Sequence, residues 1–441
     1  MTNKVYRAGM TNEYEKKCCY NTIKSKKYLI VGVSLRSRGG EAMVFEACKK
    51  IKEINEYNEI LLATTSFEYD LNFLKKVQNP YKIKVLDLTR PGHSSSGYIN
   101  FGLICIYTLY DFLAILINKL LNHFKIKLNY KDKLTRYMDE ADVIIQIAGI
   151  SFTQNIGLLS AMNWAKQMLF AKIMGKKYFC LPQSYGPSGK LIKFFAKIGL
   201  NQVTHIMPRG RKSLDYLKSL NLKNKNITFV PDLAFAYDDP SEHEDEEVYK
   251  NFKIDFSRKY IALIPNTHLY NWEGQRIIKL LSEIIDYLID TYNYYVILIA
   301  HEVRADNSID DRFVNNLIYE NCVNKKNVLN ITDDLRANEI KSLLKVCDFT
   351  ICSRFHGMIS SLKMKVPPLV VGWADKYEET MELFNLENLV IDYKDLNKDD
   401  IIKKIKFLLD NRLDIVEKID KNLGKYKNSS DIMKKIIEQN L

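Results

Sequence analysis

The sequence is poor in the residue patterns that build metal sites and disulfide frameworks. Its eight cysteines include no Cys-x-x-Cys pair, and only Cys18 and Cys19 are adjacent. Because zinc sites and disulfide scaffolds need cysteines at close, regular spacing, we expect neither, and we expect no metal and no cofactor. Most of the cysteines lie in apolar or helical surroundings, which is typical of buried thiols in a reducing compartment.

A secretion signal and long blocks of one charge are also lacking. Residues 1–26 are polar, without the apolar core of a signal peptide, so we expect a loose lead-in and a cytoplasmic protein. Lys and Arg number 65 against 53 Asp and Glu, a net charge of +12. This excess either keeps a Lys-rich surface soluble or favours anionic partners such as acidic lipid or a phosphorylated ligand. No basic run is interleaved with aromatic residues, so nucleic acid is not an expected partner.

Short apolar segments alternate with helical patterns in two halves of the chain. This alternation predicts parallel sheets, and hence two doubly wound, Rossmann-like α/β domains at residues 27–237 and 257–441. The second domain is expected to end in a helical tail. Between the domains, the acidic run within residues 238–256 is expected to be a solvated linker. The predicted strands are residues 28–33, 60–65, 83–88, 143–148, 178–181, 203–207, 226–230, 260–264, 294–300, 328–331, 344–352, 369–372 and 389–392.

An apolar helical insertion at residues 100–121 interrupts the first half. A spanning helix needs roughly 20 apolar residues, and the internal Asp111 counts against one. Lysines follow closely, so the helix could lie in a membrane interface and attract anionic headgroups, which would make the protein peripheral to the inner face of the membrane. The alternative is a helix packed against the sheet or against a partner subunit. The lysines are Lys119, Lys125, Lys127, Lys131 and Lys133.

Glycine and small polar residues stand where several predicted strands end. Gly149 and Ser151 follow one strand, Gln183 ends the next, and Arg209 comes after a third. Ligands of open α/β sheets bind at the carboxyl ends of the strands, so these turns predict one cleft. The first glycine turn, residues 34–40, does not match GxGxxG but could cradle an anion.

The most informative turn is Ser353-Arg354-Phe355-His356-Gly357, between a predicted strand and a predicted helix. A guanidinium suited to a carboxylate or phosphate stands two residues from an imidazole suited to proton transfer. The alternative is a surface arginine and a helix-capping histidine, because a short motif alone makes a hypothesis.

Several of these turns together resemble the polysaccharide pyruvyl transferase family. They occur in consistent order over about residues 32–390. The matching segments are Gly39-Gly40-Glu41-Ala42, Gly149-Ile150-Ser151-Phe152, Gln183-Ser184-Tyr185-Gly186-Pro187, Arg209 with Ser213, Pro231-Asp232, Ser353-Arg354-Phe355-His356 and Lys376. Two positions depart from the family pattern: Gly210 stands where an acidic residue is common, and residues 37–41 replace an Asn-x-Gly-Asp turn.

The resemblance implies a GT-B-type architecture, with the acceptor on the first domain and the donor on the second. It implies transfer of pyruvyl from phosphoenolpyruvate to a hydroxyl pair of a cell-surface polysaccharide or its lipid-linked precursor, as a cyclic ketal. Arg354 would hold the donor's carboxylate or phosphate, with Lys376 and Arg209 as further cations, and His356 would be the general acid or base. Further expected substrate contacts are Ser353, Gly149, Ser151, Gln183 and Glu302, with Asp311 an alternative to Glu302.

Two other functions fit the same residues. A GT-B-like glycosyltransferase would use the cations for the pyrophosphate of a nucleotide sugar, and fold analogy does not separate the two enzymes. A membrane-peripheral glycan-binding protein would keep the fold without catalysis. The intact pair of Arg354 and His356 argues against that second alternative.

Overall fold

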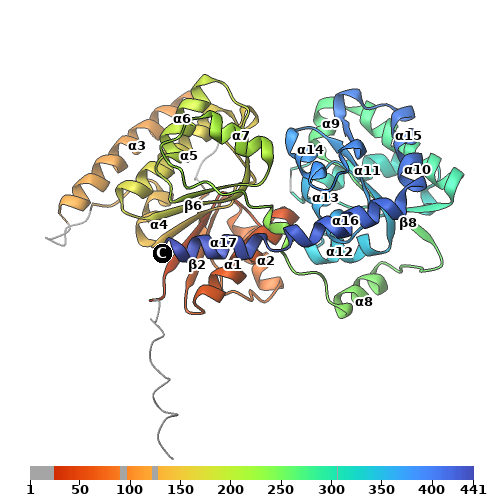
Figure 1. The fold of residues 1–441 in the computed structure, drawn as a ribbon, viewed down its shortest axis with the longest axis horizontal. Helices are drawn as coiled ribbons and strands as arrows, with labels where there is room; N and C mark the ends of the chain where they lie inside the picture. Colours follow the sequence, from red (N-terminus) through yellow and green to blue (C-terminus); the bar gives the residue numbers. More distant parts are fainter. Residues whose placement is uncertain (1–23, 90–96, 122–127, 305) are drawn as a thin grey trace, which may run out of the picture.

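The computed structural model describes residues 24–89, 97–121, 128–304 and 306–441. Nearly all of the expected lead-in, residues 1–26, lies outside these ranges. Two parallel sheets form two domains that lie side by side (Figure 1). This confirms the prediction of two doubly wound α/β domains, because every strand pairing in both sheets is parallel and helices separate the strands.

The first sheet has the order β3-β2-β1-β4-β6-β5, with β7 paired to β6. Its strands are β1 Lys27–Val31, β2 Glu59–Thr64, β3 Lys84–Asp87, β4 Val143–Gln146, β5 Ile150–Ser151, β6 Lys177–Tyr185 and β7 His205–Pro208. Its helices are α1 Arg38–Ile54, α2 Phe67–Lys76, α3 Gly97–Leu120, α4 Lys133–Glu140, α5 Gly157–Ile173, α6 Lys190–Leu200 and α7 Arg211–Ser219. The strand predicted at 226–230 is reduced to a single bridge between Ile227 and Ile206.

The second sheet has the order β10-β9-β8-β11-β12-β13. Its strands are β8 Lys259–Ile264, β9 Tyr294–Leu298, β10 Val328–Asn330, β11 Cys347–Cys352, β12 Pro368–Gly372 and β13 Val390–Asp392. The helices around it are α9 Thr267–Glu273, α10 Gln275–Tyr292, α11 Asp311–Asn321, α12 Ala337–Lys345, α13 Phe355–Lys363, α14 Asp375–Glu382, α15 Lys398–Asp410 and α16 Arg412–Tyr426.

The strand order reverses at one place in each sheet. Chain order runs outward from β1 to β2 and β3, then returns to β4 on the other side of β1, and β8 and β11 repeat this arrangement. Such switch points open a crevice at the carboxyl ends of the strands. α1 follows β1 and α13 follows β11, so both helices begin at a switch point.

Alternating residues of each strand face opposite sides of the sheet, and this divides the core. Leu29 and Val31 pack with α3 to α6, whereas Tyr28 and Ile30 pack with α1. The apolar cluster on the α1 side continues through Phe235 into the second domain. The ring of Phe235 lies 5.7 Å from that of Phe384 and 6.0 Å from that of Tyr426, centre to centre.

The acidic run expected as a linker is instead partly helical. α8 (Glu242–Asn251) begins with a capping box, in which Ser241 accepts from the backbone N–H of Glu244 and the Glu244 carboxylate accepts from that of Ser241. Glu244 and Asp245 pair with basic residues of the second domain, Arg336 and Lys345, at 2.8 and 2.6 Å. Residues 242–251 are therefore a capped helix attached to the second domain, because Glu244 and Asp245 have partners there.

The helical tail also differs from the predicted boundary. α17 (Ser429–Gln439) leaves the second domain and packs against α1 of the first, and Figure 1 shows α16 and α17 crossing from one domain to the other. Met433 and Ile437 are buried in that contact, and Lys50 pairs with Asp431 at 2.7 Å. The last helix of the tail expected within residues 257–441 therefore packs on the first domain.

The insertion expected at 100–121 is the helix α3, packed beside α5. No helix in the described ranges has the length and apolar composition needed to cross a membrane.

Candidate active site

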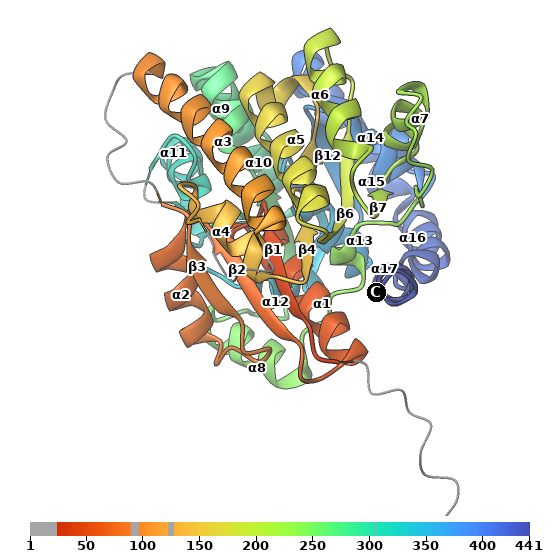
Figure 2. The same ribbon diagram turned by 90° about the vertical axis from the view of Figure 1, so that its left-hand side faces the viewer.

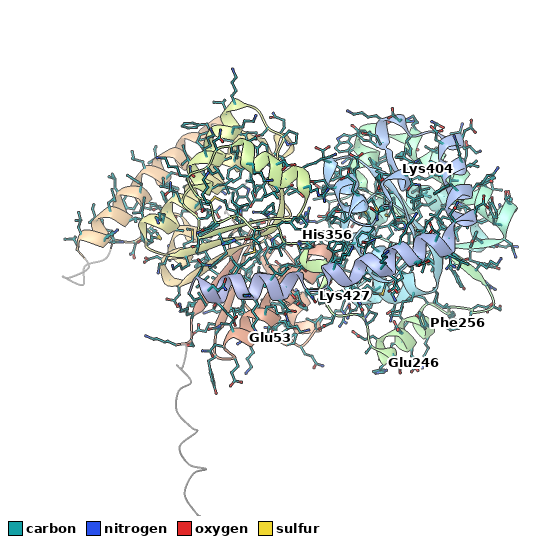
Figure 3. All side chains as sticks on the ribbon, viewed as in Figure 1. Glu53, Glu246, Phe256, His356, Lys404 and Lys427 are labelled. Atoms are coloured by element: carbon teal, nitrogen blue, oxygen red, sulfur yellow. The ribbon has the colours of Figure 1, made fainter. Side chains whose placement is uncertain are left out.

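The beginnings of α1 and α13 face each other across the domain junction. Ser37 caps α1 by accepting from the Gly40 N–H at 3.0 Å, and the Arg38 N–H donates to the carbonyl of His301 in the other domain at 3.3 Å. A Cβ on Gly39 would lie 1.9 Å from Nδ1 of His356. Glycine is therefore required where the first domain meets the imidazole, which Figure 3 places at the junction of the domains.

His356 is held as a neutral imidazole. Burial lowers its pKa to about 4; Asp232 opposes this shift, and the nearby cations Arg209 and Lys376 add to it. Its Nε2 is buried without a hydrogen-bond partner and lies 3.8 Å from the Asp232 carboxylate. A buried neutral imidazole with a free ring nitrogen is suited to accept a proton.

His301 lies beside His356, and it was not among the predicted site residues. The two rings are stacked with centres 6.5 Å apart and planes inclined by 15°. Burial, together with the nearby His356 and Arg354, holds the pKa of His301 well below its ordinary value, and its Nε2 is also unpartnered. Two neutral imidazoles thus lie side by side just beyond the ends of β9 and β11.

Arg354 is committed to two carboxylates of its own domain. It donates to both oxygens of Asp311, at 2.8 and 2.5 Å, and to Glu302 at 2.8 Å. Although burial alone would lower its pKa, Asp311 and Glu302 raise that pKa above the ordinary value. This fork-to-fork pairing fixes the turns after β9 and β11 relative to each other. The donors expected to bind substrate are therefore occupied.

Glu302 and Asp311 are structural partners in this arrangement. Asp311 is fully buried and also accepts hydrogen bonds from Thr267 and from the backbone N–H groups of His301 and Glu302. Glu302 also pairs with Arg304 at 2.6 Å. Burial would raise the pKa of Glu302, but Arg354 and Arg304 hold it below its usual range. A carboxylate so stabilised is a poor proton acceptor.

Arg209 comes from the end of β7 in the first domain and reaches the same region. Its Nε donates to Ser184 Oγ at 2.9 Å, and its guanidinium forms an ion pair with Asp232, the carboxylate beside His356. The guanidinium also stacks on Phe355, 4.1 Å from the ring centre. Arg209 and Asp232 thus connect the first domain to the His356 turn.

Lys376 is the cation of this region whose charge is least compensated by its neighbours. Its ammonium lies over Trp373, Phe355 and Tyr377, at 4.5, 5.1 and 5.4 Å from the ring centres. Within the ranges that the structure covers, no carboxylate forms an ion pair with it. Burial, then Arg209 and Arg354, hold its pKa well below the ordinary value. A bound anion would relieve this unfavourable environment.

A cavity of about 640 Å³ lies between the two domains, next to Lys376. Its walls are the β6–α7 region of the first domain and the β12–α14 region of the second. Ser184 and Lys376 line it, so the charged cluster around His356 borders it through these two residues. The volume is that of a typical ligand pocket.

Ion pairs between α7 and α14 hold the outer side of this cavity. Glu379 accepts from the Ser213 N–H at 3.1 Å, and Lys212 pairs with Glu378 at 2.6 Å. A Cβ on Gly210 would lie 2.5 Å from Glu379 Oε1. The carboxylate of Glu379 therefore fills the space beside Gly210.

Four of the residues predicted to contact substrate do not line the cavity, and their polar groups are hydrogen-bonded within the protein. Ser353 is buried, and its hydroxyl and N–H both donate to the carbonyl of Ile264. Ser151 donates to Gln183 at 3.2 Å, and both side chains are fully buried in the first sheet. Gly149 takes a left-handed conformation with φ of 64°, and its carbonyl accepts from the Ser184 N–H. These residues shape the turns, and their side chains do not line the cavity.

The site offers little to a metal ion. Throughout the part of the chain that the structure covers, no three His, Cys, Asp or Glu side chains are grouped as metal ligands would be. Its cations, Lys376 and Arg209, are suited to an anionic ligand.

Comparison with solved structures identifies the fold. The UDP-GlcNAc 2-epimerase of Neisseria meningitidis bound to UDP-GlcNAc aligns with a TM-score of 0.58 and 12% identity over 94% of this chain and 100% of that one. HepE of Anabaena in complex with UDP and glucose gives 0.54 and 12% over 94% and 98%. A glycosyltransferase from Rickettsia africae gives 0.55 and 14% over 94% and 99%. The architecture is therefore of GT-B type.

Sequence comparison identifies the family. The amylovoran biosynthesis protein AmsJ of Erwinia amylovora is 23% identical over 323 residues, which are 70% of this chain and 75% of that protein. A sequence model of the family described as polysaccharide pyruvyl transferase matches residues 38–375, a segment that includes α1, Arg209 and His356 and ends one residue before Lys376. The chain is a transferase and belongs to the polysaccharide pyruvyl transferase family.

Proposed function

We propose that this transferase moves the pyruvyl group of phosphoenolpyruvate onto two hydroxyls of a polysaccharide sugar, or of its lipid-linked precursor, as a cyclic ketal. The observation that carries the proposal is the half-buried, unbalanced ammonium of Lys376 beside the neutral imidazole of His356, at the edge of an interdomain cavity. Phosphoenolpyruvate supplies the phosphate and carboxylate that such a cation binds.

Lys376 is the main donor-binding cation in this proposal, with Arg209 second. The two cations lie over the same ring, Phe355, and the ring's face attracts both charges. Arg354 instead positions the His356 turn through Asp311 and Glu302. An anion next to Lys376 favours its protonated form, so donor binding and proton uptake by Lys376 are coupled.

The protons of the two acceptor hydroxyls balance the proposed reaction. His356 takes the proton of the first hydroxyl as that oxygen bonds to C2 of the donor, and it then gives up a proton to C3, which becomes a methyl group, so the imidazole is neutral again. The C2–O bond to phosphate then breaks as the second hydroxyl oxygen bonds to C2. The second hydroxyl proton leaves with the phosphate, so one diol and one phosphoenolpyruvate give one ketal and one inorganic phosphate. A positioned base contributes about 10²- to 10⁴-fold to such a step.

The acceptor is proposed to be an extracellular polysaccharide or its precursor. AmsJ is named for the biosynthesis of amylovoran, and the family description specifies a polysaccharide. The fold is also that of proteins solved with UDP or a UDP-sugar, and this makes a nucleotide-sugar glycosyltransferase the alternative to test.

The deciding experiment offers the protein both donors. It is incubated with lipid-linked oligosaccharides and either phosphoenolpyruvate or UDP-sugars, while phosphate and UDP release are measured and products are analysed by mass spectrometry. We expect phosphate release and a product heavier by pyruvate less one water. UDP release without phosphate release would establish the glycosyltransferase, and ligand-dependent thermal stabilisation without turnover would establish a binding protein.

A variant at Lys376 tests the donor site. Lys376→Met keeps the length and apolar contacts of the side chain but removes its charge, so we expect KM for phosphoenolpyruvate to rise about tenfold or more, since a charged hydrogen bond is worth about 1.5–3 kcal/mol. Lys212→Met removes the cation on the opposite cavity wall, whose ammonium is already paired with Glu378. An equal rise of KM in both variants would contradict the assignment to Lys376.

A further inference from the structure

α3 exposes an apolar stripe on the side turned away from the domain. At about 100° per residue, Ile106, Leu109, Leu113, Ile117 and Leu120 fall on one face. Their exposed fractions, 63% for Ile106, 61% for Leu109, 49% for Leu113 and 76% for Leu120, are far above those of core residues. The opposite face, with Ala114 and Ile115, is buried against the domain. The helix is thus apolar on both faces, and only one face has a partner within the described chain.

The neighbouring helices extend this stripe into a surface. α5 packs against both α3 and α6, and Figure 2 shows the three helices next to one another on one side of the domain. Near its beginning α5 exposes Leu158 and Leu159, and α6 exposes Leu191 and Phe194. We call the exposed apolar residues of α3, α5 and α6 the apolar surface. Large contiguous apolar surfaces on soluble proteins mark interaction sites.

The charges on these three helices are almost all positive. They carry Lys119, Lys166, Lys172, Lys190, Lys193 and Lys197, against a single acid, Asp111. Asp111 is buried and accepts the backbone N–H groups of Lys131 and Asp132 at 2.7 and 3.0 Å. The lysines of α6 are exposed and make no ion pair within the described ranges. Lys166 is paired with Asp132 at 2.9 Å. The three helices therefore combine exposed apolar side chains with exposed positive charge and carry no exposed acid.

One end of the apolar surface lies at the interdomain cavity. Gln154 and Pro187 line the cavity, and α5 and α6 begin only a few residues after them. The Gln154 side chain accepts the Gly189 N–H at 3.0 Å, which ties these two helix beginnings together. A layer in contact with Leu158 and Leu191 would therefore lie next to the cavity mouth.

We propose that the apolar surface docks this enzyme on an anionic lipid bilayer, with the cavity mouth facing membrane-bound acceptor. Apolar side chains enter the interface between headgroups and acyl chains while the surrounding lysines meet anionic headgroups. A bilayer fits better than a second copy of this chain, because the lysines of α6 would face the same lysines or basic neighbours across such a contact. The choice of a lipid-linked acceptor rests on the proposed function, whereas the docking does not.

Vesicle binding tests the docking directly. The full chain is sedimented with vesicles of phosphatidylcholine alone and with vesicles containing about one-third phosphatidylglycerol, since basic residues near an anionic surface attract it. We expect binding to the anionic vesicles. The triple variant Lys190→Glu, Lys193→Glu, Lys197→Glu and the double variant Leu109→Ser, Leu113→Ser should each lower the partition coefficient about tenfold or more.

Matched controls change the same residue types on the second domain. Lys403, Lys406 and Lys421 are exposed, as are Phe256, at 70%, and Leu413, at 82%. Figure 3 shows Phe256 at the far side of the second domain. The triple Lys-to-Glu variant and the double variant Phe256→Ser, Leu413→Ser should bind anionic vesicles as the wild type does. Equal losses in the two sets, or no vesicle binding by the wild type, would overturn the proposal.

Two further measurements separate the other outcomes. If ultracentrifugation showed a wild-type dimer that the Leu109→Ser, Leu113→Ser variant dissociates, without vesicle binding, a second copy would replace lipid as the occupant. With phosphoenolpyruvate, the surface variants should release phosphate normally on a water-soluble saccharide acceptor but slowly on a vesicle-embedded one. Absence of phosphate release with both acceptors, in wild type too, would refute the proposed function and leave vesicle binding as an independent result.

Discussion

His356 is a histidine whose surroundings keep it ready to accept a proton at neutral and mildly acidic pH. Its pKa of about 4 means that the neutral form prevails far below the ordinary value of 6.5. Protonation removes the base, so activity is present above the shifted pKa and lost as pH falls through it. We therefore expect the acid limb of kcat/KM, which reports the free enzyme, at a pH of about 4.

Replacing the imidazole tests this role. His356→Gln should lower kcat by about 10²- to 10⁴-fold, with a smaller change in KM for phosphoenolpyruvate, and should abolish the acid limb. His243→Gln is the control, because that side chain is 81% exposed on α8. Phosphate release measured across pH reports both quantities. An unchanged acid limb in His356→Gln would mean that another group sets it.

Arg354 stabilises the fold of the site more than it binds ligand. Removing it leaves the buried Asp311 without a counter-charge, while Glu302 keeps only Arg304, and breaking such a pair costs about 3–5 kcal/mol. We expect Arg354→Met to lower the free energy of unfolding by that amount in urea denaturation. Lys218→Met, which breaks an exposed pair with Asp215, should cost at most about 1 kcal/mol. A stable Arg354→Met protein with a raised KM would instead return this arginine to the donor site.

The sequence indicates where these residues lie but not how they are paired. Arg354 and His356 could be placed at a strand end because the apolar strand and the following helix are local patterns. The partners of Arg354 lie 43 and 52 positions earlier in the chain, at Asp311 and Glu302. Such pairing depends on the order of strands in the sheet. The sequence does not distinguish an arginine that binds a substrate anion from one that pairs with a buried carboxylate.

At the scale of elements, the beginning of α1 fixes the imidazole. Gly39→Ala would place a methyl group 1.9 Å from Nδ1 and 2.3 Å from Cε1 of His356, so the ring or the helix must move. A displacement of about 1 Å at a reacting group can cost about 10²-fold in rate, so we expect kcat to fall by up to that factor while the fold persists.

Gly424→Ala is the matched control for this change. A Cβ at Gly424 in α16 meets no atom within 4 Å, and alanine is the better helix former by about 1 kcal/mol. We expect unchanged kcat and an equal or higher melting temperature. If kcat were the same in Gly39→Ala and in the wild type, the close contact between Gly39 and His356 would not matter for the rate.

Sequence patterns fail for elements whose burial depends on contacts with residues far along the chain. The acidic run that includes the beginning of α8 has the composition of a linker, yet Ser241 and Glu244 form a capping box and Val248 is buried. The spacing of Ser241 and Glu244 was a readable signal for a helix start. The pairing of Glu244 with Arg336, 92 residues away, was not.

At the scale of the whole molecule, the site exists only while the two domains hold their relative position. Gly39 and Arg209 come from the first domain, and His356 and Lys376 from the second. The apolar cluster that passes through Phe235, and the return of α17 onto α1, join the domains. Sequence periodicity predicts that α17 is helical, but it cannot tell which domain receives the apolar face, because both offer apolar surfaces.

Shortening a buried side chain of α17 tests whether this junction controls activity. Met433 is fully buried, so Met433→Ala should lower the free energy of unfolding by about 2–5 kcal/mol through the cavity it leaves. Ile432→Ala, at a position 37% exposed on the same helix, should change it by less than about 0.5 kcal/mol. Because α17 packs on α1, whose beginning contacts His356, kcat should fall with stability in Met433→Ala. Calorimetry should show one transition moving to lower temperature, whereas two transitions with only one displaced would mean that the domains unfold independently.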